Sequence, residues 1–226
     1  MRLVKALRGF AGTQPFDSVS RIYAWHELDG GVEPDWLRLH QWLVTCPKAG
    51  DGDDDSANSY TWARPRHVVM FTAIGRGSET AAFGLARYPE TVTADDGTVV
   101  PTGAGDGYDW RNFCKTQYAS LPRYGGFDHF LRIHGGIVAV LDEAERLGMS
   151  VDVRDDGKFW DHRDAGLLRA EVDRWNGLVA VVAGKLKDKL GEAGIHDIIA
   201  PITDDPLFEH LEAKGQELLE PPDDSE

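Results

Sequence analysis

Three polar side chains interrupt the apolar faces of three expected helices, and together they could perform acid–base chemistry. Gln117, His134 and Glu171 each lie in or beside an apolar stripe when residues are placed at about 100° per step. An unpaired buried polar group costs roughly 1–3 kcal/mol, so we expect the three side chains to meet if their helices pack together. A histidine beside a carboxylate can act as an acid–base pair where a cleft reaches it. The alternatives are a hydrogen-bond network in the core, or a Glu171 that extends into solvent.

Cys114 is the candidate nucleophile. A reactive thiolate needs a helix N-terminus or a nearby cation, and Cys114 is expected about one turn into its helix, beside Lys115, with His134 as base. The alternative is a buried cysteine that packs as a small hydrophobic residue. Tyr118 shares an apolar face of this helix with Cys114 and is a candidate ligand contact.

Two other segments carry candidate ligand contacts. Glycines at 75 and 77 follow an expected strand, where backbone N–H groups could converge on an anion and Arg76 would add a charge-assisted contact. An ordinary turn is the alternative, because the third glycine and following helix of a dinucleotide-binding fingerprint are absent. Trp160 lies in a stretch dense in charge and could line a ligand pocket or close the core beneath a hairpin.

Several sequence motifs of common sites are incomplete or missing. Asp51, Asp53 and Asp55 match the first ligand spacings of an EF-hand loop, but Ser56 replaces its glycine and Trp62 its bidentate glutamate. The chain has no Gly-x-Ser-x-Gly elbow, no His-Glu-x-x-His and no Cys-x-x-Cys. The sequence therefore identifies no metal ligands and leaves the cofactor unknown.

The two halves of the chain differ in the secondary structure that must position these residues. Alternating or buried β-forming residues predict strands in the first half, and helical spacing predicts most of the second half. The expected strands are 21–28, 67–74 and 83–88, with hairpins at 91–100 and 151–160. The expected helices are a short one from Pro34 to about 43, then 109–119, 127–147, 164–190 (capped by Asp164) and 206–214.

Strands before helices, without alternation of the two, predict an α+β fold in which a mostly antiparallel sheet from the N-terminal half packs against a helical C-terminal half. We expect one domain over residues 1–219 and a disordered acidic tail over 220–226. The first hypothesis for a site is a pocket between the helices 109–119, 127–147 and 164–190 and the strand 68–74.

The composition of the chain limits the partners and the cellular compartment that we expect for the protein. The 226 residues carry a formal net charge of -14, which opposes binding to nucleic acid and to anionic membranes. Two distant cysteines and the lack of a signal peptide or apolar span predict a cytoplasmic protein with reduced thiols, and the excess of arginine and aspartate suggests a bacterial source. A small-molecule ligand and a homo-oligomer remain candidate partners. The functional hypotheses are a small-molecule-binding or hydrolase-like acid–base enzyme and, as alternative, a non-enzymatic accessory or interaction protein.

Overall fold

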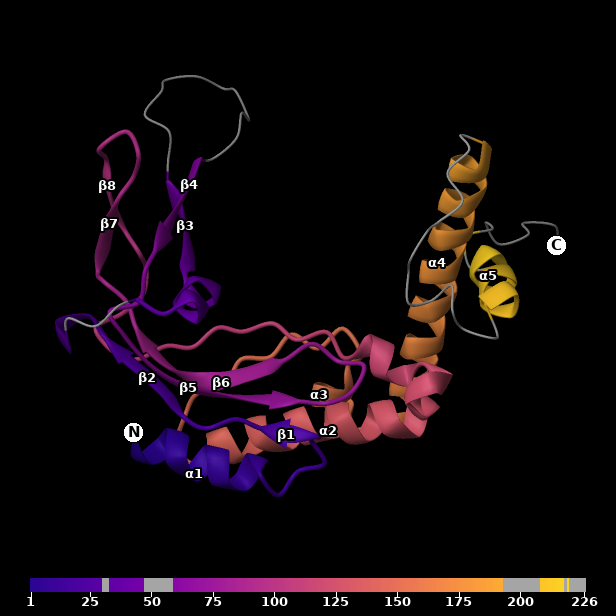
Figure 1. Ribbon diagram of the computed structural model, residues 1–226, viewed down its shortest axis with the longest axis horizontal. Coiled ribbons are helices and arrows are strands. Elements are labelled where there is room, and N and C mark those ends of the chain that lie inside the picture. The colour runs from indigo at the N-terminus through magenta and orange to yellow at the C-terminus, as the bar shows by residue number, and fades with distance from the viewer. Residues whose placement is uncertain (30–32, 47–58, 193–207, 218, 220–226) are drawn as a thin grey trace. The chain divides into compact units, whose positions relative to one another are not determined.

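The computed structural model describes residues 1–29, 33–46, 59–192, 208–217 and 219 (Figure 1). The chain divides into two compact units, the first formed by residues 1–74 and 80–114 and the second by 75–79 and 115–226. Antiparallel sheets occur mainly in the N-terminal half and helices mainly in the C-terminal half, so the predicted α+β class is confirmed. Among the described residues, no helix has the length and apolar character needed to cross a membrane. The aspartates 51, 53 and 55 and the tail 220–226 lie outside the described residues.

The main sheet of the first unit is built on strand β5. This strand spans His67–Ile74, the bounds predicted from its run of β-branched and apolar residues, and its residues 68–71 are all buried. Three strands pair with it antiparallel: β1 (Ser18–Val19), β2 (Tyr23–His26) and β6 (Ala81–Arg87). Between β1 and β2 the Ser20 hydroxyl accepts the amide N–H of Thr72 at 2.9 Å, which continues the pairing where the ladder is interrupted.

Two short hairpins complete the sheets of the first unit. One pairs β3 (Trp42–Cys46) with β4 (Ser59–Ala63), and the other pairs β7 (Thr91–Thr93) with β8 (Val99–Pro101). The second hairpin was predicted from its Asp-Gly turn and is confirmed. The helix predicted from Pro34 to about 43 is instead a 3₁₀ helix over Asp35–His40, and it ends earlier than predicted because β3 begins at Trp42.

An amphipathic helix, α1 (Arg2–Ala11), opens the first unit. Its buried residues Val4, Leu7 and Ala11 follow helical spacing, so one face of the helix carries its apolar contacts and packs against β5. This helix was not predicted.

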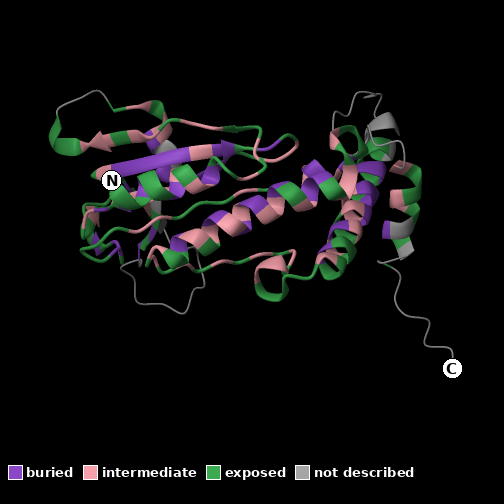
Figure 2. Cartoon of the chain, turned by 90° about the horizontal axis from the view of Figure 1, so that it is seen from below, coloured by how far each residue is buried: buried purple, intermediate pink, exposed green. Residues whose placement is uncertain are grey.

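The described residues of the second unit form four α-helices: α2 (Gly126–Arg146), α3 (Phe159–His162), α4 (Ala165–Glu192) and α5 (Phe208–Glu217). The predicted helices 127–147, 164–190 and 206–214 are therefore confirmed with small changes of boundary. Asp164 caps α4, since its Oδ1 accepts the amides of Gly166 at 2.7 Å and Leu167 at 3.1 Å. The helices bury one face and expose another, as the alternation of colours along them shows (Figure 2).

Two predicted elements are absent. Residues 109–116 form no helix, because Asp109 exchanges two main-chain hydrogen bonds with Ala86 of β6 and Trp110 Nε1 donates to the Ala82 carbonyl at 3.0 Å. The only helical turn of that segment is a 3₁₀ helix over Gln117–Ser120. The predicted hairpin at 151–160 is also wrong, because this segment forms no strand and ends in α3.

Candidate acid–base site

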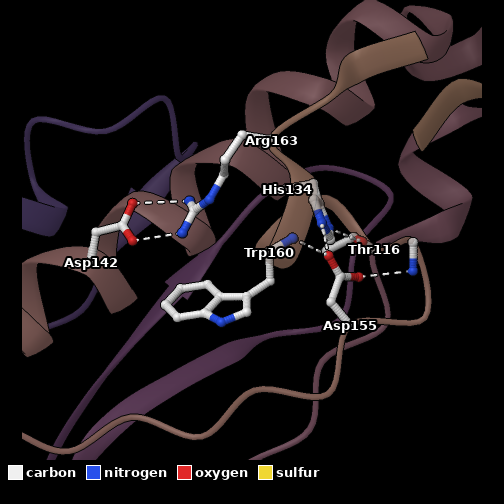
Figure 3. A network of polar contacts seen from close by, with 7 residues as sticks. Thr116, His134, Asp142, Asp155, Trp160 and Arg163 are labelled. Carbon is white, nitrogen blue, oxygen red and sulfur yellow. Dashed lines mark hydrogen bonds and ion pairs between the residues drawn. The ribbon is translucent and has the colours of Figure 1, made fainter. Parts of the chain in front are cut away.

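His134 lies in the middle of α2 and is hydrogen-bonded at both ring nitrogens (Figure 3). Nδ1 lies 3.1 Å from the hydroxyl oxygen of Thr116, and Nε2 lies 3.2 Å from Oδ2 of Asp155. The side chain of His134 is 14% exposed and that of Asp155 is 9% exposed. A hydroxyl, an imidazole and a carboxylate therefore form a continuous chain of hydrogen bonds with limited access to water.

The loop before α3 holds the Asp155 carboxylate in place. Its Oδ1 accepts the amide of Gly157 at 2.9 Å, and its Oδ2 accepts the amide of Trp160 at the same distance. Burial alone would raise the pKa of Asp155, but the hydrogen bond and charge of His134 and these two amides outweigh burial and lower the pKa to about 2. Asp155 is thus an anion at neutral pH.

The ionised state of Asp155 fixes the proton arrangement of the site. A carboxylate can only accept hydrogen bonds, so the contact to His134 requires a proton on Nε2. In the neutral ring Nδ1 is then an acceptor, and the Thr116 hydroxyl donates to it. This polarity, from hydroxyl to imidazole to carboxylate, is the one used by nucleophile–base–acid triads.

Aromatic rings fix the plane of the imidazole. Phe130, one turn earlier on α2, stacks on His134 with ring centroids 5.3 Å apart, and Phe159 of α3 meets it edge-on at 5.8 Å. Thr116, with 8% of its surface exposed, lies directly before the 3₁₀ helix Gln117–Ser120. The imidazole therefore has little freedom to rotate away from either partner.

The single turn α3 is bounded by two residues in the left-handed conformation. Lys158 has φ 58° and Arg163 has φ 53°, backbone angles that are uncommon for residues other than glycine and asparagine. Arg163 forms a bidentate ion pair with Asp142 of α2 at 2.8 and 3.0 Å, and its guanidinium lies 4.6 Å from the centre of the Trp160 ring (Figure 3). These contacts hold the strained turn against α2. They thereby also position the Trp160 amide that donates to Asp155.

The three residues expected to converge do not do so. Glu171 binds Lys158 Nζ at 2.7 Å and Arg174 at 2.9 Å, and these two hydrogen-bonded cations lower its pKa. Gln117 donates from Nε2 to Asn176 Oδ1 at 3.1 Å. His134 takes Asp155 and Thr116 as partners instead, so the expected meeting of Gln117, His134 and Glu171 is corrected.

The remaining predicted site residues lie in other surroundings. Cys114 is half-buried and lies outside any helix, so the expected help from a helix N-terminus is wrong. Tyr118 packs against the cluster that includes Leu121 and Ala180. The main-chain carbonyl of Arg76 contacts His129 Nε2 at 2.9 Å, and Trp160 contributes its amide to Asp155. Their roles in ligand binding stay predictions.

Sequence reasoning missed Asp155 and Thr116. Asp155 begins an Asp-Asp-Gly turn, and an aspartate that precedes a glycine by two residues commonly binds the amides of its own loop, which is the signal that could have identified it. Thr116 carries no comparable signal, because its partner His134 is 18 residues away.

No metal cluster marks this site among the described residues. Within the described part of the chain, no group of three or more histidine, cysteine or acidic side chains is placed to hold a metal ion. A hollow of about 490 Å³ lies in the first unit, and the residues lining it include Trp25, Glu33, Leu37, Trp62, Arg64 and Pro89, none of which is a predicted site residue. Comparison with protein-family models, curated proteins and solved structures finds no match.

Proposed function

We propose that the protein is a hydrolase-like acid–base enzyme for a small-molecule ligand, in which His134 moves a proton to and from the Thr116 hydroxyl. The observation that carries the proposal is the doubly bonded imidazole, with a hydroxyl at Nδ1 and an ionised carboxylate at Nε2. A weak hydroxyl nucleophile gains reactivity when a base accepts its proton and a third group orients the base.

Each of the three side chains has one role in this proposal. Thr116 Oγ1 attacks an acyl carbon while its proton passes to His134 Nδ1, and the same proton leaves with the departing alcohol. Water then attacks the acyl group and gives a proton to His134 Nδ1, which passes it to Thr116 Oγ1 as the carboxylic acid leaves. Asp155 keeps the proton on Nε2 and stabilises the imidazolium that forms.

A panel of small activated esters provides the test, with the purified chain compared with four variants. We expect Thr116→Val and His134→Gln each to lower the rate by about 100-fold or more, because each breaks the proton relay. Thr116→Ser should keep activity. Glu171→Gln is the matched control, since Glu171 lies on α4 and binds Lys158 and Arg174 instead of His134.

Circular dichroism must show that the variants remain folded before the rates are compared. Hydrolysis that is equal in the parent and in folded His134→Gln would contradict the proposal. So would the absence of hydrolysis across a panel that varies both the acyl and the alcohol group.

A second candidate is a non-enzymatic protein in which this network only holds the fold together. The observation that favours it is that Asp155 also binds the amides of Gly157 and Trp160, which would anchor the 155–160 loop to α2. In that case His134→Ala would lower the melting temperature and Thr116→Val would change no measurable activity.

A further inference from the structure

Two histidines face each other across neighbouring strands of the first unit. His26 of β2 and His67 of β5 are direct partners in the antiparallel register. The adjacent pair, Glu27 and Arg66, is joined by a main-chain hydrogen bond of 2.8 Å, so the histidines occupy a non-hydrogen-bonded position, where opposite side chains lie closest. Their ring centroids are 4.9 Å apart and the rings are inclined by 53°.

This spacing matches the spacing of two imidazoles on one metal ion. With a zinc–nitrogen distance of about 2.1 Å, two coordinated rings have centroids about 4.5 Å apart at a right angle and about 5.2 Å apart at the tetrahedral angle. The observed 4.9 Å falls between these values. The tilt also excludes flat stacking as the reason for the approach.

Each ring makes a hydrogen bond through Nδ1. The Nδ1 atom of His67 lies 2.7 Å from the Tyr108 hydroxyl, and Nδ1 of His26 accepts the amide of Leu28 at 3.1 Å. In the part of the chain that the structure describes, neither Nε2 has a hydrogen-bond partner. Coordination through Nε2 would move the His26 proton to Nδ1 and release the Leu28 amide to water, which is accessible because Leu28 is 86% exposed.

We propose that His26 and His67 form a surface site for a divalent transition-metal ion of the imidazole-preferring class, such as Zn²⁺, with water as the remaining ligands. Imidazole nitrogen suits zinc, copper and nickel and discriminates against magnesium and calcium. The Tyr108 hydroxyl is the positioning group, because a partner at the second ring nitrogen fixes the orientation of a coordinating histidine. The net charge of -14 also raises the local concentration of cations.

Titration calorimetry with Zn²⁺ tests this site on the full chain, stripped of metal and purified without a polyhistidine tag. We expect one equivalent of Zn²⁺ to bind saturably. His26→Ala and His67→Ala should each weaken its affinity by about 10- to 100-fold. The matched control is His162→Ala, which removes an exposed histidine of α3 and should leave the affinity unchanged. Magnesium at the same concentration should give no binding heat at the site.

Tyr108→Phe separates the positioning group from the ligands. This variant should bind zinc with up to about 10-fold lower affinity while His67 continues to coordinate. The imidazole C–H resonances of His26 and His67 should both shift when zinc is added. Equal affinity in the parent and in folded His26→Ala and His67→Ala would overturn the proposal, as would the lack of saturable binding. Either result leaves the hydrolase proposal at His134 unaffected, because the two sites share no residue.

Discussion

Replacing Asp155 by asparagine should remove a defined part of the acid sensitivity of the protein. The carboxyl has a pKa of about 2 in the folded chain against an ordinary value of 3.8. That difference corresponds to about 2 kcal/mol of folding free energy. Since the folded pKa is the lower one, this stabilisation is present above pH 3.8 and is lost as the pH falls towards about 2.

The assay is chemical denaturation at several values of pH, followed by circular dichroism at 222 nm, which reports on the helices. Between about pH 5 and 2 the free energy of unfolding of the parent should fall by about 2 kcal/mol more than that of Asp155→Asn, with the other carboxylates contributing equally to both proteins. A nuclear magnetic resonance titration of the Asp155 carboxyl carbon should give a midpoint near 2 in the parent. The matched control is Asp156→Asn, because Asp156 is next in the chain and its carboxylate is 73% exposed.

Two results would refute the reasoning. The first is an Asp155 carboxyl that titrates near its ordinary value, which would mean that the amides of Gly157 and Trp160 and the His134 ring do not stabilise its charge. The second is a parallel loss of stability in the parent and in Asp155→Asn, since the acid sensitivity would then come from other groups.

Three further substitutions test the local structure, each by thermal or denaturant unfolding. Asp164→Ala should cost about 1 kcal/mol because α4 loses the cap on its first amides, and an unchanged midpoint would contradict the capping role. Gly84→Ala should destabilise by about 2 kcal/mol or more, since a Cβ there would lie 2.6 Å from the Val69 carbonyl oxygen in the paired strand. Gly9→Ala is its counterpart, with open space around the new methyl group, and should stabilise α1 by up to about 1 kcal/mol.

The elements predicted well are those with a strong local pattern. The strand β5 has a continuous β-forming run, and α2 and α4 have long apolar stripes that end at glycine or begin at a capping aspartate. Helix α1 also has the pattern, with Val4, Leu7 and Ala11 on one face, so its spacing was sufficient to predict it.

The elements predicted wrongly are those that distant partners determine. Trp110 and Cys114 suit a helix by spacing, but the main chain at Asp109 pairs with Ala86 and the Trp110 indole binds the Ala82 carbonyl. Tertiary pairing therefore overrides local periodicity in this segment.

The candidate site was predicted in part. His134 was identified because a histidine inside an apolar stripe needs a buried partner, but that partner could not be chosen from spacing alone. Glu171 was expected to meet His134 because it flanks the apolar stripe of its own helix, whereas the structure gives this role to Asp155 in a loop. A loop residue has no periodicity to reveal which helix it contacts.

The connection between β5 and β6 has a consequence for dissecting the protein. Residues 75–79 belong to the second unit although the chain on either side of them belongs to the first. The His129 ring bonds the Arg76 carbonyl and the Lys115 amide binds the Glu79 carboxylate, so a fragment that begins at 115 would lack both acceptors. A recombinant second unit therefore needs these five residues grafted onto it.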